Sequence, residues 1–146
     1  MPVSRGRSMA ARHERSSRDP SEFTWEASEW PTFLHLDLFD EEWSDIGLKD
    51  DDLRELQGEI MASPERHPVV PGTGGLRKIR FAPSRVARGK SGAYRVGYVR
   101  FRQFGFILLV TVWGKNDKSD LSARDRNAIA AIVRDIRRAL EARRDR

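Results

Sequence analysis

The chain has no cysteine among its 146 residues. That absence excludes a disulfide scaffold, a zinc site with thiolate ligands and a cysteine nucleophile. Long hydrophobic runs are also missing: the longest covers residues 106–113, includes Thr111 and is too short to span a bilayer. The N-terminal residues lack the apolar stretch of a secretory signal. We therefore expect one domain of ordinary size in the cytoplasm, without a membrane partner.

Carboxylates are almost absent from one long part of the chain. Residues 66–118 hold twelve Lys and Arg against Asp117 alone, a net charge of +11. Residues 31–65 hold eleven acids against two bases, a net charge of −9, and the whole chain carries +5. A field this uneven attracts polyanions, of which nucleic acid is the commonest in the cytoplasm. The alternative is that the acidic segment folds against the basic one and cancels its field.

The pattern of apolar residues separates an extension from a folded domain. Residues 1–30 are rich in Arg and Ser, so we predict a disordered extension there and a folded domain over residues 31–146. The domain has four predicted strands, at 33–39, 76–82, 93–101 and 104–113. Its predicted helices lie at 50–63 and 122–140, with a helical turn at 40–45 that ends at Gly47. This order predicts an α+β fold, a small, largely antiparallel sheet with N-terminal helices and a C-terminal helix packed on one face.

Common nucleotide and metal motifs do not fit the sequence. The glycine-rich stretches at 72–75 and 89–92 each precede a predicted strand, whereas a phosphate-binding loop must lead into a helix. His13, His35 and His67 lie far apart with no metal-ligand spacing. We therefore expect neither a metal nor another cofactor.

One group of cations has a spacing that suggests chemistry. Side chains alternate along a strand, so Lys78 and Arg80 should share the face of strand 76–82 that points away from the helices. In the next strand, Arg95 should point away from the tyrosine row, and we expect both arginines to face solvent. Lys90 lies on the connecting loop, and Lys115 follows the last strand. The five cations are predicted to converge on one concave sheet face, as a catalytic site or as a plain phosphate-binding surface.

Four ordered blocks resemble HigB-type toxins of the RelE/ParE superfamily. They are GTGGLRKIR at 72–80, GKSGAYRVGY at 89–98, Leu108-Leu109, and WGKNDKSDL at 113–121. The resemblance implies the RelE fold and the toxin of a type II toxin–antitoxin pair. Such toxins cut mRNA in the ribosomal A site, and their partner is a cognate antitoxin, here expected to be a HigA-like DNA-binding protein.

The resemblance also implies roles for the cations. RNA can be cut without metal when its own 2′-OH attacks the adjacent phosphate, which gives a cyclic phosphate and a free 5′-OH. Lys78 and Arg80 would supply the base and the charge stabilisation, and Arg95 would hold the scissile phosphate. Lys90 and Lys115 would add phosphate contacts.

The remaining candidates for RNA binding are Arg77, Arg88, Trp113 and Lys118. Some relatives carry Tyr at the position of Trp113. A tryptophan ring can stack on a base but has no phenolic proton to donate, so the general acid stays unassigned.

Two other functions compete with the endonuclease. A ParE-like toxin would inhibit gyrase through protein contacts, and an RNA-binding module would use the same basic face without cleavage. The predicted convergence of Lys78, Arg80 and Arg95 favours the nuclease over the gyrase inhibitor, since protein contacts need no phosphate-directed cluster.

Overall fold

A computed structural model describes residues 3–4, 31–86, 93–114 and 116–145. Most of the predicted disordered extension lies outside these residues, and so do Arg88, Lys90 and Lys115. The elements are β1 (Val3–Ser4), β2 (Thr32–Leu36), α2 (Asp37–Ile46), α3 (Asp50–Ala62), β3 (Arg77–Phe81), β4 (Tyr94–Phe101), β5 (Phe106–Gly114) and α4 (Ala123–Arg144). The α+β class is confirmed.

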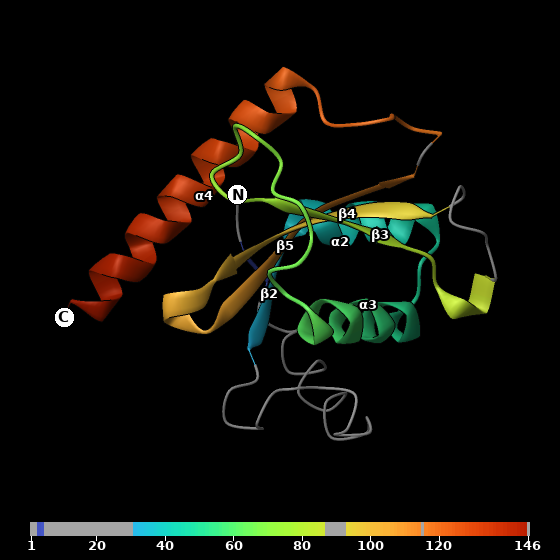
Figure 1. The fold of residues 1–146 in the computed structure, drawn as a ribbon, viewed down its shortest axis with the longest axis horizontal. Helices are drawn as coiled ribbons and strands as arrows, with labels where there is room; N and C mark the ends of the chain where they lie inside the picture. The colour runs from blue at the N-terminus through green and yellow to red at the C-terminus, as the bar shows by residue number, and fades with distance from the viewer. Residues whose placement is uncertain (1–2, 5–30, 87–92, 115, 146) are drawn as a thin grey trace.

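The strands form one mixed sheet in the order β1-β2-β5-β4-β3 (Figure 1). Only the β2–β5 pair is parallel, so the prediction of a largely antiparallel sheet is confirmed for the described strands. A register shift interrupts the β4–β5 ladder, where Gly97 lies opposite Thr111 but Tyr98 lies opposite Leu109. Val110 is thus an extra residue in β5, and the alternation of side chains reverses beyond it.

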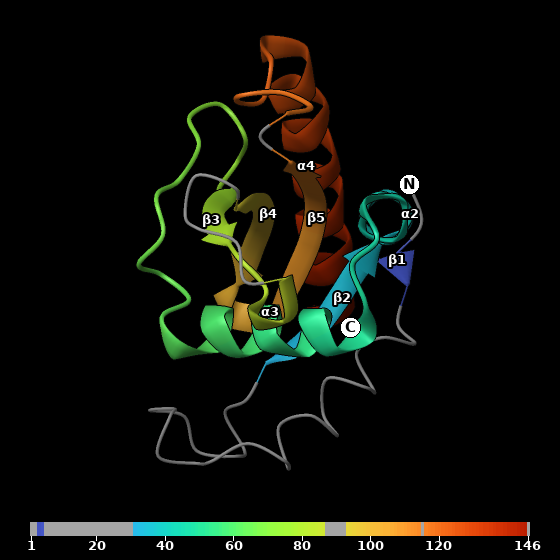
Figure 2. The ribbon, with the colours of Figure 1, turned by 90° about the vertical axis from the view of Figure 1, so that its right-hand side faces the viewer.

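The helices cover both faces of the sheet, so the expectation that all of them pack on one face is wrong. On one face, residues of α2 and α3 such as Phe39 and Leu56 join a hydrophobic cluster with Val96 and Leu109. On the other face, residues of α4 join a second cluster with Leu108 and Trp113. Figure 2 shows α3 and α4 on different sides of the strands. Because both sheet faces carry apolar residues, each needs its own helical cover.

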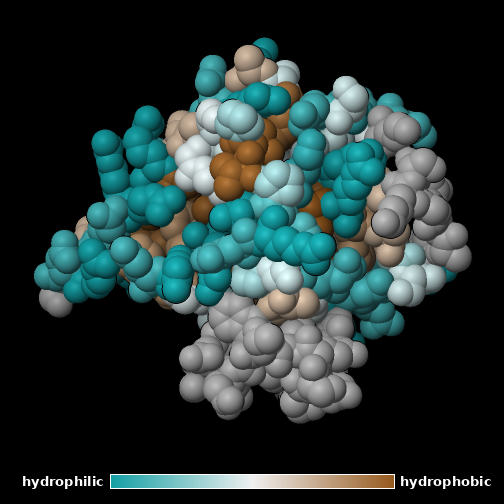
Figure 3. Space-filling view, in the orientation of Figure 1, coloured by the Kyte–Doolittle hydropathy of each residue, from teal (hydrophilic) through white to brown (hydrophobic). Residues whose placement is uncertain are grey.

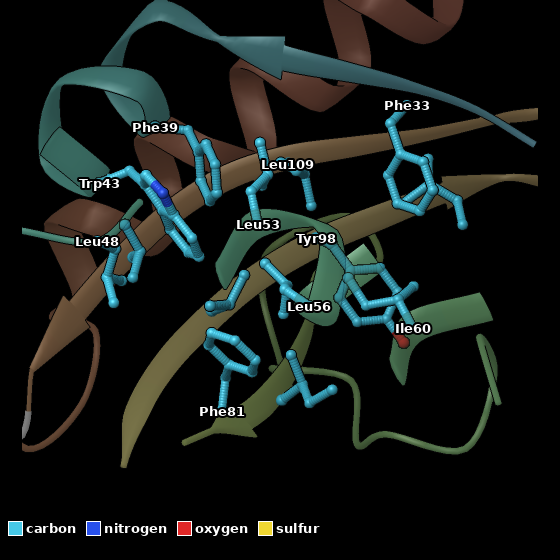
Figure 4. Packing of buried hydrophobic residues seen from close by; sticks show 14 of the residues in the cluster. Phe33, Phe39, Trp43, Leu48, Leu53, Leu56, Ile60, Phe81, Tyr98 and Leu109 are labelled. Carbon is cyan, nitrogen blue, oxygen red and sulfur yellow. The ribbon is translucent and has the colours of Figure 1, made fainter. Parts of the chain in front are cut away.

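The first strand is shorter than the sequence pattern predicts. β2 ends at Leu36, and α2 starts at Asp37 instead of continuing the strand to residue 39. Phe39 and Trp43 are four residues apart, so one helix face carries both rings into the core. The ring centroids lie 5.4 Å apart, and Trp43 also stacks on Phe81 at 6.0 Å (Figure 4). The packing of these rings outweighs the strand-like alternation.

Helix α3 begins with three aspartates, as predicted, and the third is buried. The Asp52 carboxylate accepts a hydrogen bond of 2.8 Å from the Lys49 N–H and forms an ion pair of 2.7 Å with Arg85. Burial alone would raise the pKa of Asp52, but the bonds from Arg85 and from Lys49 outweigh it and lower the pKa. Asp52 therefore holds the start of α3 to Arg85, in the segment that follows β3.

The free edge of β5 is capped by an acidic side chain from α2. β5 continues past the end of β2, and there Glu42 accepts hydrogen bonds from the Thr111 hydroxyl at 2.7 Å and from the Val112 N–H at 3.3 Å. Burial raises the pKa of Glu42. The contact satisfies a backbone donor that has no neighbouring strand.

The C-terminal helix starts at the predicted capping box. The Asp125 N–H donates to the Ser122 hydroxyl at 3.0 Å, and the Ser122 N–H donates to the Asp125 carboxylate at 3.2 Å. Ile129 and Val133 are buried against the sheet, whereas hydrophilic residues cover most of the face drawn in Figure 3.

Among the described residues, no helix has the length and apolar character needed to cross a membrane.

Candidate nucleic-acid interface

The strand register brings three of the predicted cations to one face of the sheet. In the β3–β4 ladder, Arg80 lies directly opposite Arg95, and Lys78 lies opposite Gly97. In the β4–β5 ladder, Arg95 lies opposite Trp113. Trp113 belongs to the cluster that contains α4, so this is the α4 face of the sheet. We call Lys78, Arg80 and Arg95 the cation row.

Arg80 and Arg95 place two like charges directly across from each other. Arg80 is exposed, but Arg95 is only 7% exposed, and its guanidinium donates to the Ala93 carbonyl. The expectation that Arg95 faces solvent is wrong, because it lies on an inner strand between Arg80 and Trp113. Among the described residues, no carboxylate pairs with either arginine. Like charges opposite each other destabilise a sheet, and a bound anion would relieve the repulsion.

Lys78 has a carboxylate neighbour that the sequence did not predict. Its Nζ lies 3.5 Å from Asp120 Oδ1, and Asp120 Oδ2 lies 3.7 Å from Nη2 of Arg126. The hydrogen bond from the Leu121 N–H lowers the pKa of Asp120, and the charges of Lys78 and Arg126 lower it further. Asp120 precedes α4 and Arg126 lies on its first turn, so the start of the helix adds one acid and one base to the site.

Trp113 is not placed to stack on an RNA base. Its ring is only 2% exposed and packs with Leu121 and Ile129 in the cluster beneath α4. The extra residue in β5 turns Trp113 to this face, and the helix then covers it. Lys118 lies over the ring, with its Nζ 5.5 Å from the ring centroid and 3.3 Å from the Asp125 carboxylate. Lys118 thus covers the ring of Trp113, and Trp113 forms part of the apolar layer beneath α4.

Arg77 lies apart from the cation row. It pairs with Tyr98, and its Nη1 donates to the carbonyls of Glu65 at 2.8 Å and His67 at 2.6 Å. Strand alternation directs Arg77 to the α3 face, opposite Lys78 and Arg80. The geometry gives Arg77 a structural role, which is to tie β3 to the loop that follows α3.

Arg88, Lys90 and Lys115, for which we predict RNA or phosphate contacts, lie outside the described residues. The segment that ends at residue 86, just before Arg88 and Lys90, is described, and α3 holds it in place. Ser84–Val86 forms a short 3-10 helix. The Ser84 hydroxyl donates to Glu55 at 2.8 Å, and Arg85 pairs with Asp52.

The acidic segment does not neutralise the cation row. Where its carboxylates meet the basic segment, Asp52 pairs with Arg85 and Glu65 pairs with Arg100 at 3.0 Å. Within the described structure, no carboxylate of residues 31–65 pairs with any member of the row. The helices that carry the acids pack on the opposite sheet face. The alternative in which the acidic segment cancels the field therefore fails at this face.

The described tyrosines and histidines lie on the other side of the sheet. The Tyr98 hydroxyl donates to the Pro64 carbonyl at 2.7 Å, and burial raises the pKa of Tyr98 to about 12. Tyr94 and His35 contact the α3-side cluster. Burial lowers the pKa of His67, and the charges of Arg66 and Arg77 add to the effect. Around the cation row, the described titratable side chains are Lys, Arg and Asp.

Sequence reasoning missed Asp120 and Arg126 because neither lies on a strand of the cation face. They reach it from the segment before α4 and from the first turn of the helix. No protein-family model matches the sequence.

Proposed function

We propose that this protein is a metal-independent endoribonuclease, the toxin of a type II toxin–antitoxin pair that inhibits translation by cutting mRNA. The observation that carries the proposal is the opposed pair Arg80 and Arg95, two cations without a carboxylate partner among the described residues. An arrangement that weakens the fold is typical of a site whose function requires it. A phosphate bound at the exposed Arg80 would supply the negative charge that the pair lacks.

The cation row has suitable chemistry for attack by the RNA 2′-OH. Arg80, which is exposed, would contact the scissile phosphate, and the positive charge of Arg95 directly across from it would help to stabilise the additional negative charge of the phosphorane. Lys78, on the same strand and face, would lie beside the attacking ribose, where its ammonium would add to the positive charge around the phosphate. The products would be a 2′,3′-cyclic phosphate and a 5′-OH.

The proposal includes dependence on the ribosome. The row contains no imidazole among the described residues, so its chemistry on free RNA should be slow. A ribosome that holds mRNA in a near-attack geometry would supply part of the missing acceleration by proximity and orientation. Purified protein should therefore cut mRNA on translating ribosomes far faster than naked mRNA at the same salt concentration. Equal rates on both substrates would contradict ribosome dependence.

A partner is also part of the proposal. A toxin active on mRNA requires restraint in its own cell, and we propose a cognate antitoxin, a small DNA-binding protein encoded beside this chain. A stable complex would bury about 1,200–2,000 Å² in total. Co-expression with the neighbouring gene should rescue growth, and the two products should purify together.

The test of the nuclease is induction of the chain in growing cells, followed by mapping of mRNA ends. Wild-type protein should stop growth and produce new 5′-OH ends in phase with codons. Arg80→Gln should slow cleavage by about 10²–10³-fold, the typical cost of one transition-state contact. Arg138→Gln is the matched control, because Arg138 is exposed on α4 and its loss changes the net charge equally.

The outcomes separate the competing functions. Cleaved DNA with intact mRNA would support a gyrase inhibitor, and intact nucleic acids with RNA retained on the protein would support a binding module. Full toxicity of Arg80→Gln at equal expression would remove the proposed site.

A further inference from the structure

We propose that Lys78 and Arg126 form a position for a second phosphate of the RNA backbone, which the Asp120 carboxylate occupies in the free protein. The inference depends on the proposed function, because the first phosphate is the one at Arg80 and Arg95. It adds to the site a residue of α4 that the sequence motifs did not include.

Asp120 stands between two cations that come from different parts of the fold. One carboxylate oxygen faces the Lys78 ammonium on β3 at 3.5 Å, and the other faces the Arg126 guanidinium on α4 at 3.7 Å. Its Oδ1 also accepts a 2.8 Å hydrogen bond from the Leu121 N–H. The carboxylate thus marks a point where an anion with two acceptor oxygens meets both cations.

Arg126 has hydrogen-bonding capacity that the described structure leaves unused. Its Nε is buried and has no hydrogen-bond partner among the described residues. The contact with Asp120, at 3.7 Å, is an ion pair beyond hydrogen-bond distance. A guanidinium offers five N–H donors in a planar fork that fits the paired oxygens of a phosphate.

A phosphodiester can replace the carboxylate at this point. Both groups carry one negative charge shared by two terminal oxygens. The contacts to be broken are partly exposed, since the side chains of Lys78, Asp120 and Arg126 are 29%, 43% and 31% exposed. Ion pairs of this kind contribute little net stability, so their exchange for a phosphate costs little.

The proposed second phosphate position lies at the distance from Arg80 that separates neighbouring phosphates of an RNA chain. Lys78 and Arg80 are two residues apart on β3 and share a face, so their Cα atoms are separated by about 6.6 Å along the strand. That distance is comparable to the separation of neighbouring phosphates in an RNA chain. With the scissile phosphate at Arg80 and Arg95, the next phosphate falls at Lys78 and Arg126.

The test measures the binding of two short RNAs whose 2′-OH groups are methylated, so that they cannot be cut. A dinucleotide carries one phosphodiester and a trinucleotide carries two. Wild-type protein should bind the trinucleotide more tightly, and Arg126→Gln should remove most of that gain. Arg124→Gln, an exposed neighbour on the same turn, should keep it. Asp120→Asn should tighten trinucleotide binding by about three- to tenfold. Asp135→Asn, on α4, is the control, because it changes the net charge equally, and it should tighten trinucleotide binding less.

The outcomes distinguish this inference from the proposed function. If Arg80→Gln weakens both RNAs but Arg126→Gln behaves like Arg124→Gln, the first site stands and the second phosphate position is wrong. If Asp120→Asn binds the trinucleotide no more tightly than Asp135→Asn, the proposed exchange of carboxylate for phosphate is wrong. If Arg80→Gln changes the affinity of neither RNA, the proposed function itself fails. Thermal unfolding of each variant verifies that the fold is intact.

Discussion

Removal of one charge from the opposed arginine pair should stabilise the protein while it destroys the proposed activity. Arg80→Gln deletes one of two like charges that face each other across β3 and β4. Glutamine keeps much of the side-chain length and its polarity. Because neither arginine has a carboxylate partner among the described residues, the substitution breaks no ion pair there. The repulsion between the two guanidinium groups therefore disappears.

The expected size of the gain is taken from the general scale of charge repulsion. Two unit charges about 10 Å apart repel by about 1.7 kcal/mol at an effective dielectric constant of about 20. Arg95 is buried but Arg80 is exposed, so solvent and salt screen part of this energy. We therefore expect the free energy of unfolding to rise by about 0.5–1 kcal/mol. The melting temperature should rise by about 1–4 °C.

Urea unfolding followed by tryptophan fluorescence measures the effect. The gain should be largest at low ionic strength and should shrink as salt screens the pair. Inorganic phosphate should also reduce the difference in stability between Arg80→Gln and wild type, because it binds near the two arginines of the wild type and stabilises the wild-type fold by mass action. Arg138→Gln serves again as the control, since it removes one positive charge from an exposed helix position.

A lower stability of Arg80→Gln than of wild type would contradict the predicted repulsion between the two arginines. A gain no larger than that of Arg138→Gln would also contradict it, because the gain would then reflect net charge alone. A gain in stability without loss of cleavage would show that the repulsion exists but serves another purpose.

Two further predictions concern residues that position the site. Asp52→Asn should cost about 1–2 kcal/mol near neutral pH relative to Asp51→Asn, because the buried carboxylate pairs with Arg85. The pKa of Asp52 is lowered in the fold. The carboxylate therefore contributes its full share of the free energy of unfolding above the ordinary pKa of 3.8 and loses it as the pH falls through the lowered pKa. Urea titrations at several pH values across this range measure the loss. Tyr98→Phe should cost about 1 kcal/mol through the lost bond to Pro64, yet leave mRNA cleavage unchanged in the end-mapping assay, and a large loss of cleavage would place Tyr98 in the mechanism.

The sequence by itself predicted what depends on local pattern and on charge. Strand alternation placed Lys78 and Arg80 on one face because side-chain direction in a strand follows from residue parity. The Ser122 capping box and the aspartates that begin α3 are local signals, and both helices start where those signals predict. The excess of positive charge in residues 66–118 also required no knowledge of the fold.

Tertiary structure decided everything that depends on contacts between distant segments. The extra residue Val110 reverses the alternation of side chains along β5 and turns Trp113 under α4. No local feature of the strand sequence predicts this extra residue. The burial of Arg95 comes from its place on an inner strand, which is set by strand order. Asp120 and Arg126 reach the cation row only because α4 crosses the face opposite α3. Parity, caps and net charge are properties of neighbouring residues, whereas register shifts, the choice of sheet face and ion pairs between elements arise only when the whole chain is packed.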